Sequence, residues 1–198
     1  MFSIFKKKTP EGPTFEHLIV ARLNARVQPI DRGEYFEDPL DEVLKSSGVG
    51  EVTGGGTQLA DEPDGIEFVD VEIYAKDTSD EVKSTVITAL EGFGAPKGSR
   101  LVIEGQEDTP FGLLEGMGLF LNGTDLPDEV YANSDVNDTI DKLGNLLNGK
   151  GEFRGHWEGS RETALYFYGR SFEAMVSCVQ DYLDSEPSCD KTRVVQIA

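Results

Sequence analysis

The sequence contains few residues of the kinds that hold metal ions or form disulfide scaffolds. Among its 198 residues there are two cysteines, Cys178 and Cys189, and two histidines. A structural zinc site normally uses four such ligands, so the sequence predicts no metal site and no cofactor. Cys178 lies on the apolar side of a predicted helix, where we expect a small core residue rather than one half of a disulfide.

Long apolar runs are also missing. No segment approaches the roughly 20 apolar residues that cross a bilayer. At the N-terminus, MFSIFKKKTPEGP places its lysines after the apolar residues, which is the reverse of a secretory signal. We therefore expect a cytoplasmic protein with residues 1–14 as a disordered tail. A basic tail that touches a membrane surface is the alternative interpretation.

Positive charge is scarce. The chain has 18 Lys and Arg residues against 37 Asp and Glu residues, which gives a formal net charge of −19. Such a charge repels nucleic-acid phosphates and anionic lipid headgroups, and it attracts basic proteins. The charge therefore favours a basic protein partner and argues against nucleic acid and membrane as partners. Solubility alone is the other explanation.

No motif in the sequence identifies a reaction. His156 lies between Glu152 and Glu158 on one predicted strand, and neighbouring carboxylates would stabilise its charged form. We interpret it as a surface or interface residue, and we predict no catalytic residue. The run Gly54-Gly55-Gly56-Thr57 lacks the lysine of a phosphate-binding loop and does not introduce a helix.

The order of predicted elements repeats along the chain. In the first half the pattern predicts strands at 17–28, 51–59, 66–74 and 100–104 and helices at 38–46 and 79–93. In the second half it predicts strands at 118–121, 152–158, 163–168 and 193–197 and helices at 135–147 and 172–183. Both halves have the β-α-β-β-α-β order of ferredoxin-like folds.

Local periodicity and a short motif support this duplication. Val82, Val86 and Leu90 fall on one face of a helix, and apolar residues alternate along 67–74. The motif GE-x-x-G at 50–54 recurs at 151–155. The sequence thus predicts an α+β protein built by tandem duplication of a ferredoxin-like βαββαβ unit, with antiparallel sheets and helices on one face. The repeats span 15–105 and 117–198, and residues 106–116 form a linker.

A ferredoxin-like unit leaves one sheet face uncovered by helices, and this open face is where we expect a partner to bind. Aromatic side chains among carboxylates are typical of the energetic centre of a protein interface. The predicted open-face residues are Phe68, Asp70, Glu72 and Tyr74 in the first half, and Glu152, His156, Glu158, Tyr166 and Tyr168 in the second. Alternatively, these faces stack on one another, within the chain or in a homodimer.

Three segments carry a resemblance to known proteins. The combination of GEVTGGGTQL, IEFVDVEIYA and GFGAPKGSRL resembles a group of small, acidic, uncharacterised bacterial proteins. Some of these resemble immunity proteins, which neutralise a polymorphic toxin delivered by a neighbouring cell. The resemblance covers most of residues 17–198. It implies a partner-binding role and carries over no catalytic residue.

These observations favour an acidic protein-binding module, namely an immunity-type inhibitor of a basic toxin or effector. Two alternative hypotheses remain. One is a small-molecule-binding or hydrolytic enzyme with its site at a sheet face or at the junction between the repeats. The other is a structural oligomer that buries the open faces.

Overall fold

The computed structural model describes residues 14–61 and 65–198, so the tail expected at 1–14 lies outside the described residues except for Thr14. The first unit contains β1 (His17–Leu23), α1 (Pro29–Arg32), the π-helix η1 (Gly33–Glu37), α2 (Asp38–Ser47), β2 (Gly50–Leu59), β3 (Ile66–Ala75), α3 (Asp80–Gly92), β4 (Ser99–Val102) and β5 (Thr109–Phe111). The second unit contains β6 (Glu115–Asn122), α4 (Asp128–Ala132), α5 (Val136–Leu147), β7 (Gly151–Glu158), β8 (Glu162–Gly169), α6 (Phe172–Ser185), the 3-10 helix η2 (Pro187–Cys189) and β9 (Arg193–Gln196).

The strands form two antiparallel sheets with the same internal order. The first sheet runs β2-β3-β1-β4 and is extended by β5, and the second runs β7-β8-β6-β9. In both sheets the first and third strands of the unit lie at the centre, as in a ferredoxin-like fold. The predicted duplication of a βαββαβ unit is therefore confirmed.

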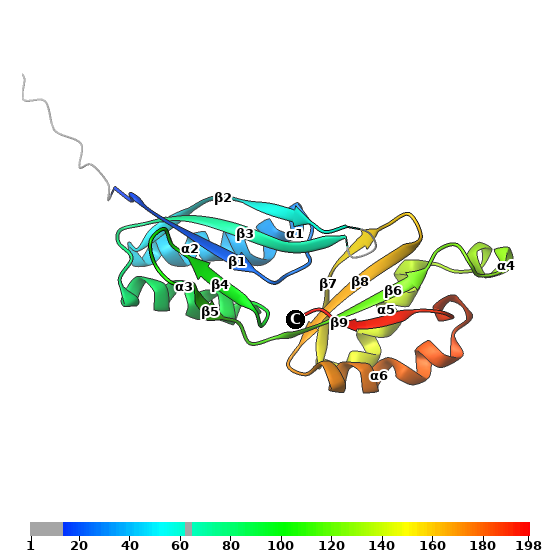
Figure 1. Cartoon of the computed structure of the whole chain (residues 1–198). Helices are drawn as coiled ribbons and strands as arrows, with labels where there is room; N and C mark the ends of the chain where they lie inside the picture. The colour runs from blue at the N-terminus through cyan, green and yellow to red at the C-terminus, as the bar shows by residue number, and fades with distance from the viewer. Residues whose placement is uncertain (1–13, 62–64) are drawn as a thin grey trace, which may run out of the picture.

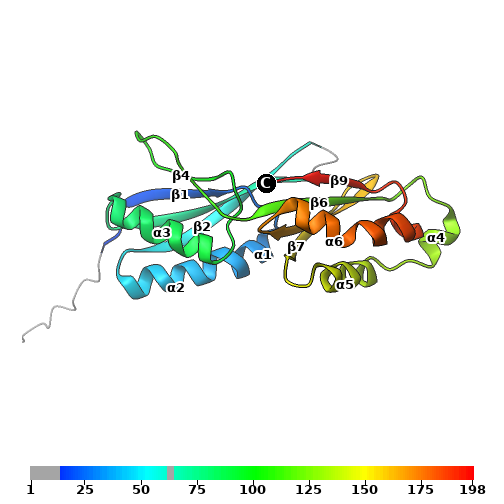
Figure 2. The same cartoon turned by 90° about the horizontal axis from the view of Figure 1, so that it is seen from below.

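The helices cover the same side of both sheets. Figure 2 shows α2, α3, α5 and α6 together on one side, with the two sheets end to end beside them. Each sheet therefore has one face packed against helices and one open face, and the two open faces point to the same side of the molecule. No helix in the described part of the chain is both long enough and apolar enough to cross a membrane.

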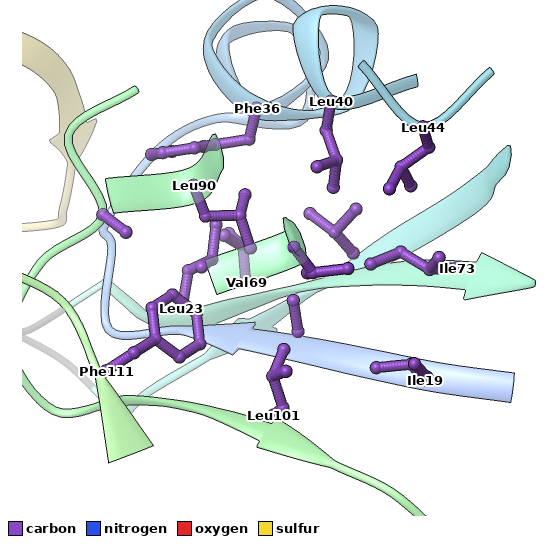
Figure 3. Close-up of a cluster of buried hydrophobic side chains, with 14 of the residues drawn as sticks. Ile19, Leu23, Phe36, Leu40, Leu44, Val69, Ile73, Leu90, Leu101 and Phe111 are labelled. Carbon is purple, nitrogen blue, oxygen red and sulfur yellow. The ribbon is translucent and has the colours of Figure 1, made fainter. Parts of the chain in front are cut away.

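Apolar side chains between helices and sheet form the core of the first unit. Leu40 and Leu44 from α2 and Leu90 from α3 point toward the strands (Figure 3). The alternation predicted for β3 is confirmed, because Val69 and Ile73 are fully buried against these helices. A second core with the same layout includes Leu143, Leu147, Leu165, Phe167, Met175 and Val179.

The first helical segment is longer than the sequence pattern predicts. The apolar stripe predicts a helix from Asp38, whereas the structure has a continuous helical path from Pro29 to Ser47 with a π-helical turn at Gly33–Glu37. Pro29 suits the first turn of a helix because proline lacks the N–H that would remain unpaired there. Within α1 and η1, residues 29–37, the only buried residue is Phe36, so this part of the helical path has no periodic stripe.

The segment predicted as a linker, 106–116, is partly strand. Thr109–Phe111 forms β5, which pairs with β4, so the first sheet has one strand more than the second. The following residues are held by backbone hydrogen bonds, from Leu113 N–H to Ala95 O over 2.9 Å and from Lys97 N–H to Leu114 O over 2.7 Å. The connection between the units is therefore fixed against the first unit.

The glycine-rich strand β2 lies close to the first helical segment. Arg32 and Glu37, which form an ion pair of 2.6 Å, pack over Gly55. A Cβ at Gly55 would overlap the backbone oxygen of Asp70 and would lie 2.8 Å from Glu37 Oε1. The next residue, Gly56, has open space at the corresponding position.

This difference gives a prediction about stability. We expect Gly55→Ala to lower the free energy of unfolding by about 1–3 kcal/mol, because the added methyl group forces backbone and side chains apart. Gly56→Ala is the matched control and is expected to leave stability unchanged or slightly higher. Urea unfolding followed by circular dichroism measures both. Equal stabilities for the two variants would contradict the close packing at Gly55.

Candidate functional site

The open face of the first sheet is accessible and carries all four residues predicted there. Glu72 and Tyr74 are exposed, Tyr74 by 38%, while Phe68 and Asp70 are half-buried. Antiparallel pairing places Tyr74 opposite Leu18 of β1, which is 45% exposed. The structure thus brings these predicted residues together and adds an exposed aliphatic side chain beside them.

Arg22 organises one end of this face. Its guanidinium donates two hydrogen bonds of 2.9 Å to the Asp70 carboxylate and lies 4.1 Å from the centroid of the Phe68 ring. The hydrogen bonds to Asp70 raise the pKa of Arg22. The bidentate pair fixes the Asp70 carboxylate in place, so Asp70 is less available to a partner than the exposed Glu72.

A groove of about 570 Å³ lies at the other end of the first sheet. Its apolar lining includes Leu18, Val20 and Val102, and the carboxylates of Glu16 and Glu104 also border it. Val20 pairs with Glu72 on one side and with Val102 on the other, so the groove continues the exposed face. We name this surface the acidic sheet face. It consists of four glutamates and four apolar or aromatic residues: Glu16, Glu51, Glu72 and Glu104, with Leu18, Val20, Tyr74 and Val102.

The second sheet differs from the prediction because β7 contains a bulge. Its pairing with β8 shifts between Phe153 and Gly155, which leaves Arg154 as the extra residue. Since side chains alternate along a strand, one extra residue moves all later side chains to the opposite face. Gly155 pairs with Tyr166 on the open face, whereas His156 pairs with Leu165 on the helix side.

This bulge corrects the arrangement predicted for His156. His156 and Glu158 do not share a face with Glu152, Tyr166 and Tyr168, so the predicted histidine between two carboxylates does not form. Trp157 instead turns to the open face, where it pairs with Ala164 and packs against the cluster that contains Tyr166. A glycine inside a strand is a sequence signal for a bulge, and Gly155 was the available signal here.

The bulge is duplicated along with the unit. In β2 the pairing with β3 shifts between Val52 and Gly54, the positions that correspond to Phe153 and Gly155 in the repeated GE-x-x-G motif. Gly54 has a φ of 145°, which favours glycine. The motif therefore specifies the same local irregularity in both edge strands.

The aromatic centre of the open face of the second sheet is buried by the rest of the chain. Tyr166 and Tyr168 are 0% and 3% exposed, so neither is accessible to a partner. They form a small cluster with Phe120, Ala164 and Ile197. The prediction that both tyrosines contact a partner is thus corrected: they are interior residues.

Residues 25–28, which follow β1, provide much of this cover. Arg26 N–H donates to the Tyr168 hydroxyl over 2.7 Å, and the Arg26 guanidinium carbon lies 5.8 Å from the Tyr166 ring centroid. Gln28 Nε2 donates to the backbone oxygen of His156 over 3.0 Å. Burial of Tyr168 raises the pKa of its hydroxyl, which stays neutral and accepts this hydrogen bond.

Arg154 and Trp157 also join the two units. The Arg154 guanidinium donates to the backbone oxygen of Phe93 over 3.3 Å and lies 4.5 Å from the Tyr35 ring centroid. Trp157 packs against both the core of the first unit and the open-face cluster of the second. Sequence reasoning missed these contacts, because they connect residues more than 60 positions apart without a shared motif.

The described residues contain no group of three or more His, Cys, Asp or Glu side chains placed to hold a metal ion. Cys189 is buried, and Cys178 is half-buried; both are free thiols. Burial raises the pKa of Cys189 to about 11. The chemistry offered by the acidic sheet face is therefore that of carboxylates and apolar side chains.

Comparison with known proteins gives no family. No family model matches the chain, and no curated protein matches it. Among solved structures, the chain is similar to an unknown protein from Galdieria sulphuraria at 8% identity, with a TM-score of 0.28 and coverage of 90% of this chain and 95% of that one. It is also similar to the first two RRM domains of yeast poly(U)-binding protein at 10% identity, with a TM-score of 0.25 and coverage of 92% and 99%.

The buried tyrosines give a prediction that separates structural from exposed residues. We expect Tyr168→Phe to lower the free energy of unfolding by about 1–3 kcal/mol, because the Arg26 N–H loses its acceptor in a buried place. Tyr74→Phe makes the same chemical change on an exposed tyrosine and should alter stability by less than about 0.5 kcal/mol. Urea unfolding of both variants measures the difference. A Tyr168→Phe protein as stable as the parent would show that residues 25–28 do not depend on this bond.

Proposed function

We propose that this protein binds a basic protein partner through the acidic sheet face, as an immunity-type inhibitor of a cationic toxin or effector. The observation that carries the proposal is the difference between the two open faces. The aromatic centre of the second is covered by residues of the same chain, whereas the equivalent face of the first presents Leu18 and Tyr74 to solvent. A protein interface needs such accessible apolar anchors at its centre.

The carboxylates around these anchors favour a cationic partner. The described part of the chain shows no salt bridge to Glu16, Glu51, Glu72 or Glu104. The nearby guanidiniums bind other carboxylates, Arg22 that of Asp70 and Arg100 that of Asp108. The negative charge of the face is therefore available. Together with the net charge of −19, it would steer a basic partner to this surface and raise the rate of association.

The composition of the face also fits the side chains that a basic partner would present. Lysine and arginine have long apolar stems and charged heads. In the groove, the stems would contact Val20 and Val102, and the heads would reach Glu16 or Glu104. Nucleic acid is disfavoured, because Arg22 and Arg100, which lie beside the acidic sheet face on the same side of the sheet, are already paired with carboxylates.

The apolar anchors can be tested with binding measurements. We expect Tyr74→Ala and Leu18→Ala each to weaken binding to the product of the adjacent gene by about 1–3 kcal/mol, since each removes an anchor from the centre of the face. Val136→Ala is the matched control, because Val136 is exposed by 39% on α5, away from this face. Isothermal titration calorimetry gives the affinities, and thermal melting shows whether the variants stay folded.

Two results would contradict this assignment. Unchanged affinity in folded Tyr74→Ala and Leu18→Ala proteins would exclude the acidic sheet face as the binding surface. The second result is a stable homodimer in which the same face is protected from hydrogen exchange. If no basic partner dissociates that dimer, the structural-oligomer hypothesis is supported instead.

The electrostatic part of the proposal has its own test. We expect the double variant Glu51→Gln and Glu72→Gln to associate more slowly and to show a weaker dependence on salt, with little change in dissociation. The control changes two exposed carboxylates of α6, Glu173→Gln and Asp181→Asn, on the helix side of the second unit. Stopped-flow kinetics at two salt concentrations compares them. Identical kinetics for the two double variants would mean that total charge, rather than this face, guides association.

A further inference from the structure

The outer edge of β9 can be compared with the matching edge of the first unit. In each unit a tyrosine opposite the glutamate of the GE-x-x-G motif marks the register: Tyr74 pairs with Leu18 of β1, and Tyr168 pairs with Gly116 of β6. Counting along β1 and β6 from these positions aligns β4 with β9, the strands on their far side. The residues that correspond are Ser99 and Thr192, Arg100 and Arg193, and Leu101 and Val194.

In the first unit this edge is occupied by β5. The strand β5 pairs with residues 99–101 of β4, and Phe111 lies opposite Ser99. The Phe111 side chain is buried and joins the core beside Leu101 (Figure 3). In the second unit β9 is the last strand of its sheet, and no strand in the described part of the chain pairs with its outer edge. The second unit therefore lacks the strand that completes the first.

The backbone of β9 has groups directed to this open edge. Ile197 N–H donates to Gly116 O over 2.9 Å, and alternate residues of an antiparallel strand bond to the same neighbour. Val195 therefore bonds to β6, whereas Val194 directs its N–H and C=O to the outer edge. Within residues 14–61 and 65–198 neither of these two groups has a hydrogen-bond partner.

Each of the other three outer edges carries a protecting feature. Val52 N–H of β2 binds the Asp41 carboxylate over 2.9 Å, and the backbone oxygen of His156 in β7 accepts from Gln28. The short strand β5 contains Pro110. Proteins use covering groups and proline to protect edge strands from pairing with another chain. Among the described strands, β9 is thus the edge left open to pairing.

A hollow of about 500 Å³ adjoins this edge, between the end of α6 and β9, and we name it the β9 hollow. Leu183, Thr192 and Val194 are among the residues that line it. Leu183 is the last buried residue of α6, as Leu90 is of α3 in the first unit. Since Thr192 corresponds to the residue opposite Phe111, the β9 hollow lies at the place that Phe111 fills in the first unit.

The rim of the β9 hollow is acidic. Asp184, Glu186 and Asp190 border it, and none of them forms a salt bridge in the part of the chain that the structure describes. Lys191 also borders it, and its ammonium donates to the backbone oxygen of Asp125 over 2.8 Å. An added strand with an aromatic side chain for the hollow and lysines for the rim would match both parts of this site.

The sequence contains such a segment before the described residues. Residues 3–8 read Ser-Ile-Phe-Lys-Lys-Lys, whereas β5 reads Thr-Pro-Phe. Both have a hydroxyl residue two positions before a phenylalanine, which matches Phe5 with Phe111. A strand that pairs with β9 in the direction of β5 continues from the residue opposite Thr192 toward Asp190. Three lysines that follow Phe5 would therefore meet the acidic rim.

We propose that β9 accepts residues 3–5 of a second copy of this chain as an added strand, with Phe5 in the β9 hollow and lysines 6–8 at its acidic rim. Backbone hydrogen bonds between Ser3 and Val194 hold the strand, and the pocket for the Phe5 side chain gives selectivity. The added strand completes the second unit as β5 completes the first. It uses the outer edge of β9 and leaves the acidic sheet face free.

The position of β1 favours a second copy over the same chain as the donor. β1 begins at the end of the first unit that faces away from the second unit (Figures 1 and 2). Residues 6–13 span at most about 30 Å when fully extended. A return along the seven residues of β1 alone takes about 20 Å, and β9 lies beyond it in the second unit. The segment therefore reaches β9 of another copy more readily than its own.

The proposal can be tested with a synthetic peptide of residues 1–9, MFSIFKKKT, as the probe. The receptor is the full chain with Phe5→Asp, whose own segment should not compete for the edge. NMR titration should show saturable shifts of the amide signals at 183–186 and 192–196. A peptide with Phe5→Asp should bind at least about tenfold more weakly, because an aromatic ring is no longer buried. A peptide with Thr9→Asp adds the same charge outside the pairing residues and should bind nearly as well as the parent peptide.

Variants of the receptor test the acidic rim. Asp184→Asn with Asp190→Asn should weaken peptide binding by up to about fivefold at low salt and by less at high salt, since exposed ion pairs are weak and screened. Asp138→Asn with Asp141→Asn is the matched control, because it removes the same charge from α5. All four side chains are exposed, so the melting temperature should not change.

Exchange between copies also predicts self-association of the parent chain. Sedimentation equilibrium should show an assembly of two or more copies that forms above the dissociation constant of the peptide. The full chain with Phe5→Asp should remain monomeric, and the full chain with Thr9→Asp should associate like the parent. Both substitutions lie outside the packed units, so circular dichroism should show the same fold in all three proteins.

Three outcomes would overturn the proposal. Peptide shifts confined to the acidic sheet face would show that β9 is not the acceptor, and equal binding by the Phe5→Asp and Thr9→Asp peptides would exclude the β9 hollow. A parent chain that stays monomeric far above the dissociation constant of the peptide would exclude exchange between copies. The Tyr74→Ala and Leu18→Ala measurements do not involve β9, so this proposal and the proposed function fail separately.

Discussion

The contact between residues 25–28 and the open face of the second sheet is the interaction on which the arrangement of this protein depends. A ferredoxin-like unit leaves one sheet face without helices, and an apolar face in that position must be covered or used. Here the Arg26 N–H binds the hydroxyl of Tyr168, and the Arg26 side chain lies over Tyr166. One unit thus completes the core of the other, and the two lie end to end with their helices on one side (Figure 1).

That contact makes two similar units unequal. The covered sheet has become interior, with a cluster of aromatic and aliphatic side chains that includes Tyr166 and Phe120. The uncovered sheet keeps Leu18 and Tyr74 at the surface beside carboxylates. Duplication therefore supplied two equivalent faces, and packing of the chain left only one of them available for recognition. The function proposed here follows from this asymmetry more than from any single residue.

Charge is used differently in the two regions of interest. Beside the acidic sheet face Arg22 and Arg100 are paired with carboxylates, while Glu16, Glu72 and Glu104 are exposed to solvent. At the junction of the units, by contrast, the Arg154 guanidinium binds both the backbone oxygen of Phe93 and the Glu152 carboxylate, so its charge serves to join the units.

The sequence by itself determined the α+β class, the duplication and the four helices α2, α3, α5 and α6, because apolar periodicity reports directly which side of an element is buried. It also located Phe68, Asp70, Glu72 and Tyr74 on one exposed face, since β3 is regular. Only the tertiary structure decided where His156 and Trp157 point and that Tyr166 and Tyr168 are interior. A one-residue bulge moves every later side chain of β7 to the opposite face. The residues that cover the second sheet lie more than 120 positions away in the sequence. Neither the bulge nor this cover can be read from the local pattern of apolar residues.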